Sequence, residues 1–330
     1  MKIGQNIAIG MAEETAYKTP VSPPTHWLNH TGDGSLDKKP EIKMSNAITG
    51  YANARHAAIG ANNVTGGITV EASAELLPVF LKGALGNIAT VDNLDGTYTH
   101  TFRVNDTTSY YSDYYLPSFT IEENTDGIAQ RTAGAKIENL KLSANVGDFV
   151  TAEATIKAVS KEAMGTPSTV VYPDIAPLMF LTGSVYEGAA ATAGSADLTP
   201  PVGLNVLADI KSFDLEIANT FGENRTISSG ADVNEHKRTK NEIKLTAKLV
   251  FNDIDMYNDY ISGTQKRFWL KLAFGNDIVV FDLPNVILDE VNIPRGKEEL
   301  EQDITATALA PSAAPADVIV ASVLNTIASY

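Results

Sequence analysis

Five histidines and several carboxylate pairs are the residues of this chain that could do chemistry. His26 and His30 have the i, i+4 spacing that brings two imidazoles to one face of a helix, as in many zinc sites. They lie in PPTHWLNH, where two prolines precede them and no acidic residue stands in helical register. Glu122 and Glu123 are neighbours in a predicted strand, so they point to opposite faces and cannot share a substrate. We therefore expect neither a metal site nor an acid–base pair here.

The remaining motifs give no stronger signal for an enzyme. The sequence has no G-x-S-x-G, no P-loop, no G-x-G-x-x-G after a strand and no H-E-x-x-H. GDGSLD at 32–37 lacks the spacing and the final glutamate of an EF-hand calcium loop. The tyrosines of YYSDYYLP are either a carbohydrate platform or, as we prefer, packing and interface residues. We expect no catalytic residues, no cofactor and no metal.

Composition excludes further classes. The chain has 330 residues, a net charge of −15, a pI near 4.7 and no cysteine. Tight nucleic-acid binding needs clustered lysine and arginine, so this charge argues against it. Disulfides and thiolate chemistry are excluded. No apolar run approaches about 18 residues and no secretory signal is recognised, so we expect no membrane span and no secretion.

The chain alternates apolar and polar residues with period two, which predicts a mainly β protein. Val150, Ala152, Ala154 and Ile156 form one apolar face of a strand that follows Gly147. Only two helices are predicted, in SAELLPVFLKGALG and FNDIDMYNDYISG, and each ends at a glycine. An Asp95-Gly96 pair indicates a hairpin.

The two halves of the chain follow the same order. In each, an alternating strand (66–73 or 241–250) leads into one short helix and then two long strands joined at Gly147 or Gly296. We interpret this as an internal duplication of a β-sandwich or half-barrel domain with one flanking helix. The predicted parts are 1–165, with an insertion near 90–118, then 166–310, and a C-terminal arm at 311–330.

The first ninety residues carry a resemblance to a known family. ETAYKTPV is followed by KPEIKMSN, a long stretch of loop, and ITVEASAELLPVFLKGALG. This order resembles the tail tube proteins of long-tailed bacteriophages, which open with a "TxYGTPV" phrase and place a helix ending in LG after a strand. Lys18 stands where that phrase has glycine.

The resemblance implies a structural virion protein of the phage tail, assembled in the host cytoplasm. Such proteins form rings that stack into a tube, and their inner sheets make a β-barrel through which DNA passes. Two domains in one chain imply trimeric, pseudo-hexameric rings. The partners implied are further copies of itself, the tape measure protein, the terminator and the distal tail protein.

Several residues are expected to serve such a tube. A carboxylate-lined channel would repel phosphate and let DNA slide, so the candidate lumen residues are Glu153, Glu299, Glu301 and Asp303. The alternative is an ordinary solvated outer face. The stretches 49–65 and 222–240 are predicted to be loops that contact a neighbouring ring. Their candidate contact residues are Asn62, Asn63, Arg225, Glu235, Lys237 and Arg238. The ends, 1–25 and 317–330, are expected to pair across chains.

Three alternatives to a tube protein remain from the sequence. One is another ring protein of the same fold, such as a tail terminator or a secretion-tube homologue. A second is a capsid-decoration or adhesin β-sandwich, for which a duplication with one helix per copy is not typical. A third is a β-rich enzyme such as a glycan hydrolase, which the missing pair of convergent acids disfavours.

Overall fold

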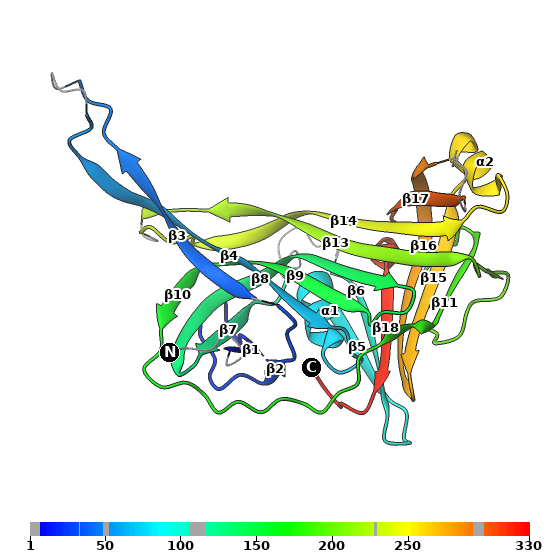
Figure 1. The fold of residues 1–330 in the computed structure, drawn as a ribbon, viewed down its shortest axis with the longest axis horizontal. Coiled ribbons are helices and arrows are strands. Elements are labelled where there is room, and N and C mark those ends of the chain that lie inside the picture. Colours follow the sequence, from blue (N-terminus) through cyan, green and yellow to red (C-terminus); the bar gives the residue numbers. More distant parts are fainter. Residues whose placement is uncertain (1–6, 33, 49–52, 106–115, 228–229, 293–299) are drawn as a thin grey trace.

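The chain forms a mainly β, antiparallel structure with two short α-helices (Figure 1). This computed structural model describes residues 7–32, 34–48, 53–105, 116–227, 230–292 and 300–330. In the first half the elements are β1 (Ile7–Glu13), β2 (His26–Leu28), β3 (Ser35–Met44), β4 (Ala57–Glu71), α1 (Leu77–Leu85), β5 (Gly86–Asp92), β6 (Tyr98–Val104), β7 (Phe119–Thr125), β8 (Ile128–Asn145), β9 (Thr151–Ala158) and β10 (Ser160–Ala163). In the second half they are β11 (Met179–Ala189), β12 (Asn205–Val206), β13 (Ile210–Asn224), β14 (Glu235–Val250), α2 (Asp255–Ser262), β15 (Lys266–Phe274), β16 (Asp277–Val291), β17 (Glu301–Ala308), the 3-10 turn η3 (Pro315–Val318) and β18 (Val320–Asn325).

One long sheet runs through both halves, in the order β3–β4–β9–β8–β13–β14–β17–β16. Its strands alternate as the sequence predicts. In β9, for example, Ala152, Ala154 and Ile156 are buried and Glu153 is exposed. One face of this sheet therefore covers the core, and the other is polar.

Two smaller layers lie beneath the long sheet and enclose the core. Strands β2–β1–β7–β8–β10 form one layer, and β12–β11–β15–β16–β18–β6–β5 form the other. Strands β8 and β16 are long enough to belong to the long sheet at one end and to a lower layer at the other. Each carries a bulge where it passes between them, after Ile137 in β8 and after Leu288 in β16. A bulge bends a strand, and these two bends bring the smaller layers underneath the long sheet.

The two helices have different environments. Helix α1 lies under the middle of the long sheet and is buried along its length, except at Lys82 (Figure 1). Gly83 permits this close packing, since an added Cβ would lie 2.5 Å from Ile137 Cδ1. Helix α2 lies at the far end, where only Met256 is buried. Gly263 ends α2 in the left-handed conformation, as its sequence predicts.

The strand pairings of the two halves correspond. In the first half the pairs are β3–β4, β4–β9, β8–β9, β7–β8 and β1–β7. In the second half they are β13–β14, β14–β17, β16–β17, β15–β16 and β11–β15. Helix α1 follows β4, and helix α2 follows the corresponding strand β14. The two halves meet where β8 pairs with β13, so that they share one sheet.

The structure differs from the sequence predictions at several places. The C-terminal segment, predicted to pair with another chain, pairs within its own chain, where β18 lies between β16 and β6. Strand β1 likewise pairs with β2 and β7. The predicted loops at 49–65 and 222–240 are mostly the ends of long hairpins. Ser73 is not the N-cap of α1: its hydroxyl accepts from the Leu76 N–H in the preceding turn, and its carbonyl accepts from the N–H of Leu77, the first helical residue. The run Tyr110, Tyr111, Tyr114 and Tyr115 lies outside the described residues.

Candidate functional site

The polar face of the long sheet is continuous across both halves. Directly opposite residues in neighbouring strands share a face, and one such row reads Thr69, Glu153, Lys141, Glu216, Lys244 and Thr307. The carboxylates of this face are Asp37, Glu71, Glu138, Glu153, Asp214, Glu216, Glu242, Asp289, Glu290, Glu301 and Asp303, and the lysines are Lys39, Lys141, Lys157, Lys211, Lys240, Lys244 and Lys248. Carboxylates outnumber lysines, so the face is acidic with interspersed positive charges.

The candidate lumen residues lie on this face where the structure describes them. Glu153 and Asp303 are exposed in β9 and β17. Glu301 forms two ion pairs that the sequence does not predict, because its carboxylate lies 2.9 Å from Lys211 Nζ and 3.1 Å from Lys248 Nζ. Hydrogen bonds from these two ammonium groups lower the Glu301 pKa. Glu299 lies outside the described residues. Nothing in the alternating pattern could reveal the two lysines, because they come from other strands.

The seam between the halves is an ordinary strand pairing. Leu215 of β13 stands opposite Leu142 of β8, and both face the core. On the polar face Asn139 Nδ2 donates to the Glu216 carboxylate at 2.6 Å, and Lys141 pairs with Asp214 at 3.2 Å. The seam thus combines core packing with charge pairing, which a neighbouring chain could reproduce.

The ends of the two long hairpins extend beyond the shared sheet. We call residues 40–44 with 57–63 the first arm and residues 220–224 with 235–240 the second arm. The second arm lies against the first half (Figure 1). Arg225, just beyond its end, donates to the Asn63 side chain at 2.7 Å, and Asn62 Nδ2 donates to Asp232 at 2.7 Å. Three of the six candidate contact residues therefore meet one another within one chain.

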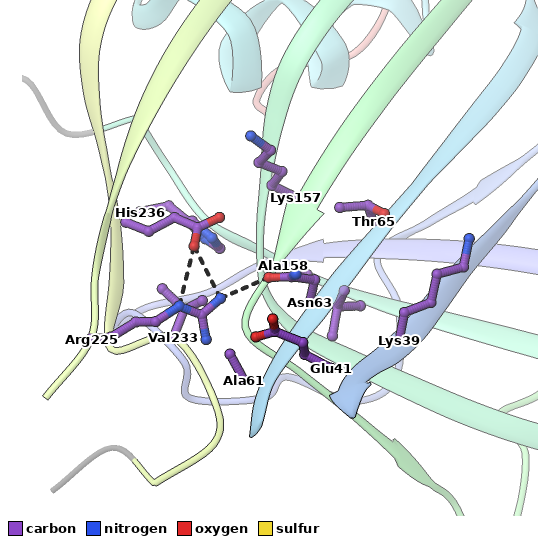
Figure 2. Close-up of a pocket in the computed structure, with 12 residues that line it drawn as sticks. Lys39, Glu41, Ala61, Asn63, Thr65, Lys157, Ala158, Arg225, Val233 and His236 are labelled. Atoms are coloured by element: carbon purple, nitrogen blue, oxygen red, sulfur yellow. Dashed lines mark hydrogen bonds and ion pairs between the residues drawn. The ribbon is translucent and has the colours of Figure 1, made fainter. Parts of the chain in front are cut away.

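The other three candidates, Glu235, Lys237 and Arg238, lie on the second arm. Arg238 is buried and donates to the Asn105 carbonyl. Glu235 and Lys237 form an ion pair at 3.5 Å. A cavity of about 540 Å³ separates the arms, and Figure 2 shows Arg225 and His236 on one side of it and Lys39 and Glu41 on the other.

Beneath the second arm lies a polar cluster that the sequence does not predict. Lys136 Nζ donates to the His236 carbonyl at 2.7 Å and lies 4.8 Å from the centre of the Tyr17 ring. The Tyr17 hydroxyl accepts from the His236 backbone N–H at 3.1 Å. Burial lowers the pKa of Lys136 to about 8 and that of His236 to about 4, and it raises that of Tyr17 to about 12. The cluster joins three distant segments and has the features of a structural contact.

The described residues hold no group of three or more histidine, aspartate or glutamate side chains that could bind a metal ion. His30 instead bonds through its ring nitrogens to the carbonyls of Gly32 and Ile7, at 2.9 and 3.0 Å. His26 stacks on Tyr330 with the ring centres 5.9 Å apart. Within the part of the chain that the structure describes, no helix is long and apolar enough to cross a membrane.

Comparison with known proteins gives one family. The model of the phage tail tube protein family matches residues 4–319, nearly the whole chain. No curated protein matches the sequence.

Proposed function

Because the chain belongs to the phage tail tube protein family, we propose that three copies close into a ring with six wall segments, and that these rings stack into the tube of a phage tail. The proposal rests on the seam between β8 and β13. There, two segments with corresponding strand pairings already stand side by side in one sheet. A closed wall removes the open edges of that sheet, which would otherwise pair with other chains.

The proposed lumen is the polar face of the long sheet. It supplies threonines and charged side chains, and its carboxylates outnumber its lysines. Binding to DNA gains strength from cations that replace counterions, so an acidic wall favours passage over adhesion. Glu153 and Asp303 are the side chains that we expect to meet DNA first, while Glu301 acts mainly within its lysine pair.

The duplication and the partners belong to the same proposal. We propose that 1–165 and 166–310 descend from one repeated unit, supported by the corresponding pairings and the matching bulges after Ile137 and Leu288. In the tail, the tube would enclose a tape measure protein and end at a terminator and a distal tail protein. Assembly would take place in the host cytoplasm before the tail joins the virion.

Microscopy tests the proposal. The purified protein, concentrated and viewed in negative stain, should form hollow tubes with a regular axial repeat. Single particles of one chain at every concentration, with or without other tail proteins, would contradict it.

A further inference from the structure

The two arms match position by position but have different surroundings. Ile42 pairs with Ile59 in the first arm, and Phe221 pairs with Arg238 at the same place in the second, just past a bulge in each hairpin. Phe221 and Arg238 are only 8% and 5% exposed, whereas Ile42 and Ile59 are 64% and 72% exposed. The second arm is covered by the first half, and the first arm projects without such cover (Figure 1).

The second half carries a surface that matches the one beneath the second arm. In the first half the covered cavity is lined by Val64 and Ala158, among others. Their counterparts, Ile243 and Ala308, line a second cavity of about 330 Å³. The lining of this second cavity includes no residue of the first arm. Helix α2, the counterpart of the buried α1, also exposes Ile261, and Ile254 just before the helix is exposed as well.

The open edges of the long sheet are complementary in charge. At the seam, Ala218 stands opposite Asn139. The counterpart of Ala218 is Lys39 on β3, and the counterpart of Asn139 is Glu290 on β16. Glu290 and its neighbour Asp289 are exposed, as are Lys39 and its neighbour Lys38. The same register between two chains therefore places a lysine opposite a glutamate, which stabilises a strand pair.

At one end of β3, the backbone groups of Leu36 are already hydrogen-bonded within the same chain. The Leu36 N–H donates to Glu123 at 2.9 Å, and the Leu36 carbonyl accepts from Lys161. Pairing with another chain therefore begins at Asp37 and continues through Lys39. Beyond that point the first arm extends over the neighbouring chain.

From these matches we propose that the first arm of one chain docks on the second half of another copy, as the second arm docks on the first half of its own chain. Ile42 and Ile59 become buried against the second half of that copy, as Phe221 and Arg238 are buried in their own chain, and Lys39 stands opposite Glu290. Asn46, the counterpart of Arg225, lies beside Glu242, the counterpart of Asn63. The interface rests on the proposed ring and specifies its contacts.

Cysteine pairs test this interface directly, because the chain has no cysteine of its own. The variant Asn46→Cys/Glu242→Cys, treated after assembly with a bismaleimide cross-linker that replaces the reach of a long side chain, should give covalent dimers and trimers on a denaturing gel. The matched control is Asn63→Cys/Arg225→Cys, whose native side chains touch within one chain. It should give a cross-linked monomer only. Tubes that form normally while positions 46 and 242 stay unlinked would overturn the interface but leave the proposed function intact.

Substitution of the matched apolar residues gives a second measurement. Ile42→Asp should leave the melting temperature of the single chain unchanged and raise the concentration needed for assembly about tenfold or more. Phe221→Asp should instead destabilise the single chain, because Phe221 is already buried. Val202→Asp, at an exposed apolar residue outside the proposed interface, should change neither quantity. Assembly of Ile42→Asp at the wild-type concentration would overturn the proposal. Absence of tubes from the wild-type protein would instead count against the function itself.

Discussion

The ammonium group of Lys136 donates a 2.7 Å hydrogen bond to the backbone carbonyl of His236, and this contact joins the two halves of the chain away from their shared seam. Lys136 is only 2% exposed, and the Tyr17 ring lies beside it. A buried lysine is costly unless its donors are satisfied. The hydrogen bond therefore holds the second arm in place.

Replacing Lys136 by methionine should lower the free energy of unfolding by about 2 kcal/mol, because the His236 carbonyl loses a charged donor. Denaturant titration of the single chain measures this. Lys141→Met, on the solvated polar face, is the control and should change stability by less than about 1 kcal/mol. Equal midpoints for the two variants would show that the Lys136 contact contributes little.

Acid should loosen the same region. Burial holds the His236 pKa at about 4, below the ordinary value of 6.5, so the folded chain keeps this imidazole neutral while the unfolded chain takes up a proton. Stability is therefore full above about pH 6.5 and falls as the pH drops toward about 4. In thermal melts, His236→Gln should reduce the loss of melting temperature between about pH 6.5 and pH 4. His56→Gln, at an exposed histidine, should leave that loss unchanged. An unchanged slope for His236→Gln would contradict the assignment.

Deleting residues 319–330 should destabilise the chain rather than only block assembly. Val320, Ala321 and Val323 are fully buried between β16 and β6, and Tyr330 packs edge-on against His100 at 4.9 Å. Removal leaves two strand edges and their apolar face open to water. The expected result is an insoluble or partly unfolded product in circular dichroism. A soluble, fully folded truncation would restore the view of the tail as an element for other chains.

Asp303→Lys should permit assembly but make the channel adhere to DNA. Asp303 is exposed and lies 4.0 Å from Lys248, so its replacement costs little within the chain. Tubes of this variant should retain duplex DNA at low salt and release it at high salt, while wild-type tubes retain none. The control is Asp95→Lys, in an exposed turn far from this face, and its tubes should retain no DNA, like wild-type tubes. Glu122 cannot serve as the control position, because it is buried. Labelling of position 303 from outside the tube would refute the lumen assignment.

The regular parts of the fold could be predicted from the sequence because they depend on local patterns. The alternation of apolar residues in 150–156 predicts strand β9, and Gly263 predicts the end of helix α2. Predictions failed where the outcome depends on distant partners. The apolar segment 317–330 needed a partner strand, but its sequence cannot show that β6 and β16 provide one. Periodicity cannot distinguish a solvated lysine from Lys136, because its burial is imposed by Tyr17 and the second arm.

The site was predictable to a similar extent. Glu153 and Asp303 share the polar face that strand alternation predicts. The neutralisation of Glu301 by Lys211 and Lys248 required the cross-strand register. The sequence indicates Asn63 and Arg225 as contacts with another ring, whereas the structure brings them together within one chain. That shift follows from the seam, which places one arm over the neighbouring half.

The number of chains in one ring tests the central claim most directly. A cryo-electron microscopy reconstruction of the assembled tube, refined without imposed symmetry, measures it. We expect three chains per ring, with the β8–β13 pairing inside each chain alternating with a β3–β16 pairing between chains, and with the polar face toward the channel. A ring of six chains, or one in which that face points outward, would contradict the account.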